Sequence, residues 1–166
     1  MGFSRSAWNH LDNSIPKTPK PNASRKARIN AGIRYIKKYL GGIWISGTSS
    51  SPAYKKADCS GLAMQYLMAG GIYAKGSGTP MLHASPGNEW DSQKLWATHK
   101  IKHVPFNSRR RGDLIFFRES YGSPIWHVGV MTSRNTMIDS WPPVIEYHSI
   151  FNGEHGVIAG VKRPFL

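Results

Sequence analysis

The stretch DCSGLAMQYLM at residues 58–68 contains Cys59, the single cysteine of this 166-residue chain. The apolar residues from Leu62 to Met68 predict a buried helix, and Asp58 is a residue type that often caps a helix N-terminus. Cys59 would then lie in the first helical turn, where free backbone N–H groups and the helix dipole favour a thiolate. The thiolate is the reactive form of cysteine, so Cys59 is our candidate nucleophile. Against this stands the usual role of a lone cysteine, a small buried apolar residue.

Two other segments have helical character. Residues 24–40 carry isoleucines and a leucine at helical spacing, and the remaining positions of this segment are largely basic. We expect this helix to pack by one apolar stripe and to end at Gly41-Gly42. A short helix is predicted around residues 91–99.

The last third of the chain is rich in strand-forming segments. Helices first and antiparallel strands afterwards predict an α+β fold, with N-terminal helices packed on an antiparallel sheet of five or more strands. Residues 1–23 contain three prolines and are interpreted as an extended arm or loop. Residues 24–166 are interpreted as a single domain. The predicted strands are residues 114–117, 127–132, 136–141, 144–148 and 157–162.

The chain is strongly basic, with a net charge of +13. Nine of its 22 Lys and Arg residues precede residue 41, which favours an anionic polymer as partner. No apolar run approaches the roughly 18 residues of a membrane-spanning helix, and the N-terminus lacks the apolar core of a signal peptide. A complete chain of this kind would be made in the cytoplasm and would leave it by another route.

A cysteine nucleophile needs a base and a group that orients the base. His127 begins a predicted strand, and a hairpin turning about Ser133 would place Asp139 directly opposite it. Opposed residues of an antiparallel pair point to the same face of the sheet, so Asp139 could accept a proton from one imidazole nitrogen. The other nitrogen would then face the sulfur of Cys59.

At these residues the sequence resembles the NlpC family of papain-like cell-wall cysteine peptidases. The resemblance covers residues 24–164 and implies that family's papain-like fold. It also implies that Cys59 is the nucleophile, His127 the base and Asp139 the residue that orients His127, a position where the family usually has histidine. The matching motifs are DCSGL at 58–62, RRGDLIFF at 110–117, HVGV at 127–130, MIDS at 137–140 and AGVKRP at 159–164.

The resemblance implies hydrolysis of an amide bond in the peptidoglycan stem peptide, commonly between γ-D-glutamate and a diamino acid. Asp58 and Ser60 resemble the residues that meet a free amine of the substrate, although helix capping would explain them equally well. Many members carry a tyrosine where this chain has Trp44, and Tyr54 is our candidate to supply the missing hydroxyl.

Three tryptophans lie close in sequence to the proposed catalytic groups and are expected to line a cleft, namely Trp44, Trp126 and Trp141. We expect a monomer that needs no cofactor or metal and binds the stem peptide, with anionic wall polymers as further partners. A phage lysin is the expected setting.

Other functions remain open at this point. An amidase of the related CHAP type would cut between muramic acid and L-alanine. A basic module that binds the wall or nucleic acid could keep the peptidase fold without catalysis. An interbacterial toxin would use the same cysteine peptidase reaction. His99 and His103 have a spacing that zinc ligands use, but their basic surroundings favour an exposed segment. The run Arg109-Arg110-Arg111 has no accompanying nucleic-acid motif, so we interpret it as wall affinity or solubility and expect no nucleic-acid partner.

Overall fold

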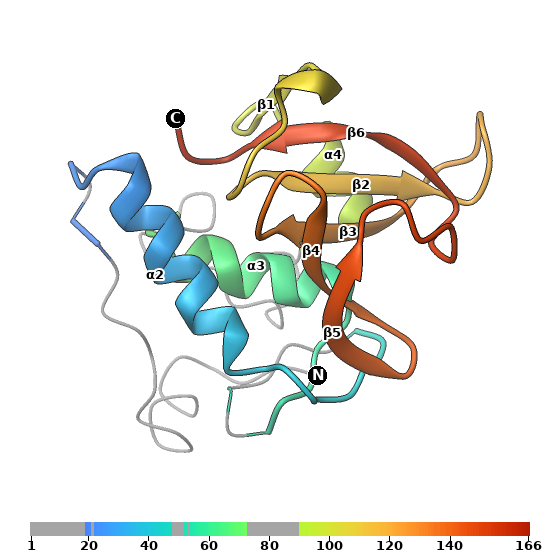
Figure 1. Cartoon of the computed structure of the whole chain (residues 1–166), viewed down its shortest axis with the longest axis horizontal. Coiled ribbons are helices and arrows are strands. Elements are labelled where there is room, and N and C mark those ends of the chain that lie inside the picture. Colours follow the sequence, from blue (N-terminus) through green and yellow to red (C-terminus); the bar gives the residue numbers. More distant parts are fainter. Residues whose placement is uncertain (1–18, 21, 48–51, 53, 73–89) are drawn as a thin grey trace.

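The computed structural model describes residues 19–20, 22–47, 52, 54–72 and 90–166. Helices precede the strands, and the predicted α+β fold is confirmed (Figure 1). The elements are α2 (Arg25–Lys37), α3 (Cys59–Ala69), α4 (Ser92–Ala97), β1 (Lys102–Val104), the 3₁₀ turn η1 (Phe106–Ser108), β2 (Leu114–Arg118), β3 (Ile125–Met131), β4 (Thr136–Trp141), β5 (Val144–Ser149) and β6 (Val157–Arg163).

Helix α2 begins at a Ser24 cap, whose hydroxyl accepts a hydrogen bond from the Ala27 backbone N–H at 3.1 Å. It ends at Lys37, three residues before the predicted end. The backbone continues in tight turns, in which the Leu40 N–H still bonds the Lys37 carbonyl at 3.2 Å. These turns keep Leu40 packed against the core, which is why the apolar period continues past the end of the helix.

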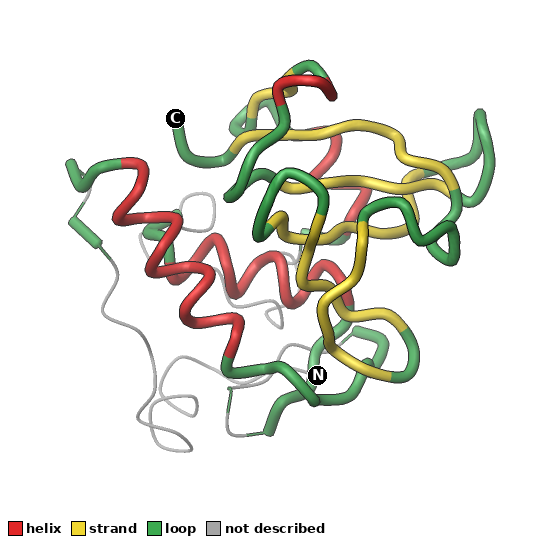
Figure 2. The backbone as a smooth tube through the Cα atoms, in the orientation of Figure 1, coloured by secondary structure: helices red, strands yellow, loops and turns green. Residues whose placement is uncertain are grey.

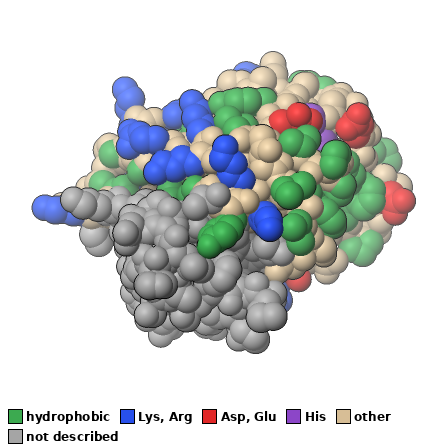
Figure 3. Space-filling view, turned by 90° about the horizontal axis from the view of Figure 1, so that it is seen from below, with side chains coloured by type: hydrophobic (Ala, Val, Ile, Leu, Met, Phe, Trp, Pro, Cys, Tyr) green, Lys and Arg blue, Asp and Glu red, His purple; other side chains and the backbone are tan. Residues whose placement is uncertain are grey.

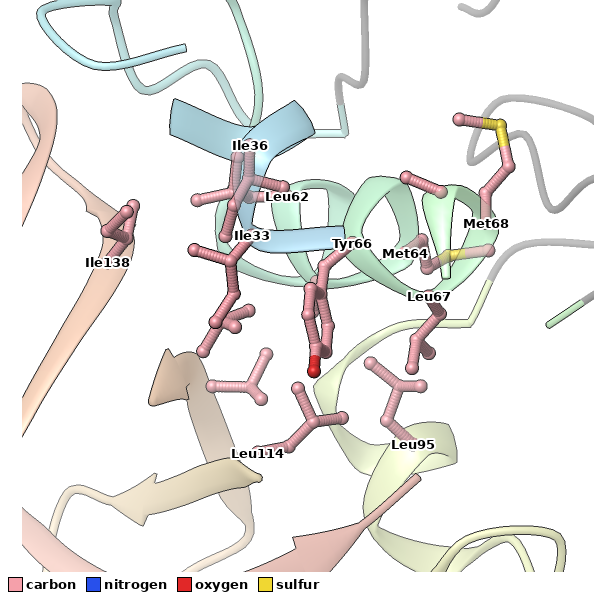
Figure 4. Packing of buried hydrophobic residues seen from close by; sticks show 14 of the residues in the cluster. Ile33, Ile36, Leu62, Met64, Tyr66, Leu67, Met68, Leu95, Leu114 and Ile138 are labelled. Carbon is pink, nitrogen blue, oxygen red and sulfur yellow. The ribbon is translucent and has the colours of Figure 1, made fainter. Parts of the chain in front are cut away.

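Helices α2 and α3 pack closely, and Gly32 permits this approach. A Cβ atom at residue 32 would lie 2.6 Å from the Tyr66 ring and 2.8 Å from the Tyr66 carbonyl oxygen. Figure 4 shows Ile33 and Ile36 of α2 meeting Leu62 and Tyr66 of α3 in this interface. The two helices therefore form one layer over the sheet.

The sheet has six strands in the order β1-β6-β2-β3-β4-β5, and every neighbouring pair is antiparallel. Five of the strands lie within two residues of the predicted bounds. Strand β1 was not predicted, because its three residues have a polar, largely exposed pattern. In Figures 1 and 2, β4 and β5 run across the direction of β2 and β6, so the sheet is strongly twisted.

Alternation along β2 builds two cores on the two faces of the sheet. Leu114 and Phe116 belong to the main cluster with the helices, while Ile115 and Phe117 belong to a second cluster on the other face. Every residue from Leu114 to Phe117 is buried. This double burial explains the continuous apolar run in the sequence.

The basic run at residues 109–111 has a structural role that the sequence analysis did not foresee. Arg109 is buried and donates to the Arg134 carbonyl at 2.9 Å and to Asn135 Oδ1 at 2.7 Å. Arg111 donates to Asn30 Oδ1 at 2.8 Å. These residues therefore link the segment before β2 to the β3–β4 hairpin and to α2.

Most of the predicted arm of residues 1–23 lies outside the described residues. Within the described ranges, no helix combines the length and apolar character needed to cross a lipid bilayer.

Candidate active site

The N-terminus of α3 presents Cys59 beside β3, next to Val128. Asp58 caps the helix: its Oδ1 accepts the Gly61 N–H at 2.7 Å, and its Oδ2 accepts the Gly47 N–H at 2.8 Å. The Ser60 hydroxyl donates to Asp58 Oδ1 at 3.3 Å and is buried. Asp58 therefore fixes both the helix start and the loop before it, which confirms the capping role.

Strand β4 holds the chain just before this helix. Ser140 is fully buried, and its hydroxyl donates to the Ala57 carbonyl at 2.6 Å. Its neighbour Asp139 is also fully buried. Two consecutive residues of β4 therefore position the start of α3 and the His127 imidazole, and the Ser140 contact was not predicted from the sequence.

Asp139 and His127 meet as predicted, but by a different pairing of their strands. The Asp139 Oδ2 atom lies 2.7 Å from His127 Nε2, and both side chains are buried. The β3–β4 ladder pairs Val130 with Ile138 and Met131 with Met137, which is shifted by two residues from the predicted register. A shift of two preserves the face on which each side chain lies, so the contact survives the error.

Gly129 lets β4 approach β3 at this point. A Cβ atom there would lie 2.5 Å from Met137 Sδ and 3.4 Å from Asp139 Cβ. Any larger residue would have to displace the buried Met137 side chain beside Asp139. The glycine of the HVGV motif therefore protects the histidine–carboxylate contact.

Cys59 and His127 line one cavity of about 340 Å³. Within the described part of the chain, the His127 Nδ1 atom has no hydrogen-bond partner, whereas Nε2 is engaged by Asp139. Nδ1 is therefore available to exchange a proton with the thiol or with a substrate. The cavity is lined by Trp44, Ser46, Asp58, Cys59, Trp126, His127, Trp141 and Pro142.

The Cys59 thiol resists ionisation, contrary to the expectation from the helix N-terminus. Burial, followed by the negative charge of Asp58, raises the pKa of Cys59 to about 12. The backbone N–H groups of Val128 and Ser60 act in the opposite direction, since they stabilise the thiolate. The thiolate prediction was therefore wrong for the isolated thiol, and a base must take its proton.

Asp139 is bracketed by three histidines, of which the sequence analysis identified only His127. Its Oδ1 lies 2.6 Å from His148 Nδ1, and its Oδ2 lies 3.2 Å from His155 Nε2. Burial by itself would raise the pKa of Asp139, but the hydrogen bonds from His127 and His148 outweigh this and lower it. Asp139 is therefore a carboxylate at neutral pH.

A signal for His148 was present in the sequence. Asp139 pairs with Glu146 across β4 and β5, so Glu146 and His148 lie on the face of Asp139. No comparable signal exists for His155, which lies in the turn segment between β5 and β6.

Aromatic rings enclose the histidine–carboxylate pair. The rings of His155 and His127 stack at 4.6 Å between centroids and 14° between planes. Trp141 packs edge-on against both, and Trp126 packs edge-on against Trp141 at 5.3 Å. The Trp126 indole N–H donates to the His155 carbonyl at 2.7 Å. This hydrogen bond joins the turn that contains His155 to β3.

Trp44 is held at the cavity by backbone contacts with the start of β5. Its backbone N–H donates to the Pro143 carbonyl at 3.1 Å, and the neighbouring Ile43 forms isolated bridges with Lys56 and Val144. Tyr54 is exposed and is not among the residues that line the cavity. Its predicted contact with substrate stays a prediction.

His99 and His103 are both exposed, as their basic surroundings favoured, and they do not share a helix face. Helix α4 ends at Ala97, and His103 lies in β1. Among the described residues, the group with metal-ligand geometry is His127, Asp139 and His155, whose ligand atoms lie within 4.8 Å of one another. The separation of 2.7 Å between His127 Nε2 and Asp139 Oδ2 is that of a hydrogen-bonded pair.

Comparison with known proteins identifies the family. The model described as "NlpC/P60 family" matches residues 41–154, which include Cys59, His127 and Asp139. The chain belongs to the NlpC/P60 family. No curated protein matches the sequence.

Solved NlpC/P60 structures share the fold. A Bacillus cereus NlpC/P60 family protein superposes with a TM-score of 0.66 and 22% identity, covering 93% of this chain and 43% of its own. A lipoprotein-like NLP/P60 family protein from Staphylococcus aureus gives 0.60 and 20%, covering 95% and 46%. The peptidoglycan hydrolase RipB from Mycobacterium tuberculosis gives 0.61 and 19%, covering 89% and 69%. The NlpC/P60 chain described here thus spans less than half the length of the first two proteins.

Proposed function

We propose that this NlpC/P60 protein is a peptidoglycan hydrolase that cleaves an amide bond of the stem peptide with Cys59 as nucleophile. One observation carries the proposal. Cys59 and His127 line the same cavity, and the Asp139 carboxylate is hydrogen-bonded to His127 Nε2, which leaves Nδ1 for proton transfer. Family membership supports it, and the similarly folded RipB is a peptidoglycan hydrolase.

In the first half of the reaction, His127 Nδ1 takes the Cys59 proton and the sulfur attacks the amide carbonyl carbon. The Cys59 backbone N–H, in the first turn of α3, donates to the resulting oxyanion. Protonated His127 then gives its proton to the leaving amine. The C–N bond breaks, and the acyl group remains on Cys59 as a thioester.

In the second half, water attacks the thioester while His127 removes one of its protons. The tetrahedral intermediate collapses, the C–S bond breaks, and the carboxylic acid leaves. The proton held by His127 returns to the Cys59 sulfur. One water is consumed for each amide bond, and Asp139 stabilises the imidazolium in both halves.

We place the cleaved bond between γ-D-glutamate and a diamino acid. Asp58 lines the cavity beside Cys59, and its negative charge suits a free ammonium group of the substrate. Ser60 supports this carboxylate through its hydroxyl. Trp44, Trp126 and Trp141 provide the apolar walls along which the peptide would lie.

The basic surface suits a bacterial wall rich in anionic polymers, as in lysis by a phage lysin. Figure 3 shows Lys and Arg side chains gathered on the side of the molecule where Figure 1 shows α2. Lys26, Arg34 and Lys37 of this helix are exposed. Together with the net charge of +13, they favour a salt-sensitive attraction to the wall.

The test is digestion of purified sacculi of several chemotypes, followed by mass analysis of the released muropeptides. We expect Cys59→Ser to lower the hydrolysis rate by at least about 10³-fold, because the weaker nucleophile cannot form the thioester. His99→Asn, a change at an exposed histidine outside the cavity, serves as the matched control and should keep full activity.

The new amine should belong to a diamino acid. A new L-alanine amine would instead identify an amidase. Undiminished lysis by Cys59→Ser would overturn the proposal in favour of a binding module.

A further inference from the structure

Asp139 makes a second hydrogen bond that the proposed reaction does not require. Its Oδ2 serves His127, but its Oδ1 lies 2.6 Å from His148 Nδ1. The other nitrogen of His148, Nε2, lies 3.0 Å from Glu146 Oε1. A continuous chain of side chains therefore runs from the half-exposed Glu146 through His148 and Asp139 to the buried base.

The strand pairing builds this chain. Asp139 of β4 stands opposite Glu146 of β5, and His148 stands opposite Met137. Because side chains alternate along a strand, Glu146 and His148 share a face, and His148 is the diagonal neighbour of Asp139. The arrangement depends on a regular six-residue ladder between two strands and not on a loop conformation.

Both nitrogens of His148 face carboxylates, and only the doubly protonated imidazolium can donate to both. The hydrogen bond to Asp139 is the main cause that raises the pKa of His148, with Glu146 and Glu154 adding to it and partial burial opposing it. The ring of His155 lies 5.2 Å away, and burial holds that group neutral by lowering its pKa to about 4. His148 therefore brings a positive charge to the outer side of Asp139.

We propose that His148 is a positioning residue for the Cys59–His127 pair. His148 fixes the Asp139 carboxylate by a hydrogen bond and partly neutralises its negative charge, and Glu146 holds His148 in place. The inference rests on the proposed function, in which His127 is the base. One hydrogen bond on each oxygen fixes the plane of the carboxylate. Without His148, the carboxylate turns about its Cβ–Cγ bond and orients His127 less well.

The shared charge has a second effect. A cation near a titrating site lowers the proton affinity of every group in that site. The acidic limb of the activity profile is the pH range in which activity rises as the site loses a proton. Removal of the His148 charge should therefore move this limb to higher pH. A purely structural role would lower stability without moving this limb.

The test compares two variants by two measurements. Because Cys59 is the single cysteine, its alkylation by iodoacetamide reports its reactivity as a function of pH without any substrate. Hydrolysis of sacculi supplies the second pH profile. His148→Leu removes both the donor and the charge, whereas His148→Asn removes the charge but keeps an amide N–H toward Asp139. His99→Asn is the matched control, and thermal unfolding shows that each variant is folded.

We expect His148→Leu to lower the maximal rate of hydrolysis about 10- to 100-fold, the effect of losing the outer hydrogen-bond partner of a metal-ligating residue, with little change in KM. His148→Asn should recover most of this rate. In both variants the acidic limb of alkylation should lie about half a pH unit or more above that of the unmodified protein.

Wild-type rates and an unmoved limb in both variants would overturn the inference. Equal losses of hydrolysis rate in the two folded variants, with the acidic limb of alkylation unmoved, would overturn it as well, because they indicate a purely structural role. If no sacculus is hydrolysed but the alkylation limb shifts as expected, the proposed function fails and the positioning role of His148 stands.

Discussion

The candidate active site combines a thiol that resists ionisation with a histidine whose ring is hydrogen-bonded to a carboxylate. With a pKa raised to about 12, Cys59 is protonated at neutral pH in the absence of a base. Transfer of the proton to His127 creates an imidazolium beside Asp139, whose negative charge stabilises it. The backbone N–H of Val128 stabilises the sulfur anion at the same time. In the proposed reaction, the pair Cys59–His127 and not the helix terminus alone produces the nucleophile.

His155 should make the stability of the protein depend on pH. Burial is the main cause that lowers its pKa from 6.5 to about 4. Between these pH values the unfolded chain binds a proton that the folded protein does not, so the free energy of unfolding falls as the pH drops from 6.5 to 4. The loss should be roughly 3 kcal/mol. Urea unfolding at several pH values measures it.

A His155→Phe variant tests the assignment of this effect. Phenylalanine keeps a ring against His127 and Trp141 but cannot titrate, so the stability should vary less between pH 6.5 and 4. His99→Asn, which changes an exposed histidine, should keep the steep dependence. An equally steep dependence in His155→Phe would show that another group is responsible.

Among the elements, α4 depends on a contact from another part of the chain. The helix has six residues, too few to be stable by itself. The buried Lys162 of β6 donates to the carbonyls of Leu95, Trp96 and Thr98 at 2.7–2.8 Å. This single ammonium group satisfies the C-terminal end of α4 and joins it to the sheet.

We expect Lys162→Met to lower the free energy of unfolding by on the order of 3 kcal/mol, because buried carbonyls lose their donor. Amide exchange in α4 should accelerate in the same variant. The matched change Lys100→Met, at an exposed position nearby, should alter stability by less than about 0.5 kcal/mol. Equal stability of the two variants in urea would contradict this role.

Across the whole molecule, the C-terminal residues connect the helical layer to the sheet. Phe165 follows β6 and is buried against Tyr66 of α3, with ring centroids 5.5 Å apart. Arg28 of α2 lies over the same ring at 4.9 Å, and Arg25 donates to the Phe165 carbonyl at 2.9 Å. One residue therefore holds both helices to the last strand.

Phe165→Ala should cost about 3–5 kcal/mol of stability, the usual range for removing a buried phenylalanine. Leu166→Ala is the control, since that side chain is 71% exposed and should contribute almost nothing. Thermal unfolding compares the two. Phe165 does not line the catalytic cavity, so Cys59 alkylation in the cold should proceed at the normal rate. A loss below about 1 kcal/mol would mean that the layers are held together elsewhere.

The sequence alone predicted the order of the helices and of five of the six strands, and the contact between Asp139 and His127. These predictions rest on local periodicity, capping residues and short motifs, which are properties of neighbouring positions. Element bounds were right within a few residues for the same reason, and β1 escaped because it is short and polar.

Only the tertiary structure decided the strand register, the reactivity of the thiol and the outer partners of Asp139. The β3–β4 ladder is short, so its register depends on packing around Gly129 and Met137 as much as on the hairpin turn. The pKa of Cys59 depends on burial, which no local pattern encodes. His148 and His155 reach Asp139 across strands and turns, because the carboxylate is buried where three separate segments of the chain converge.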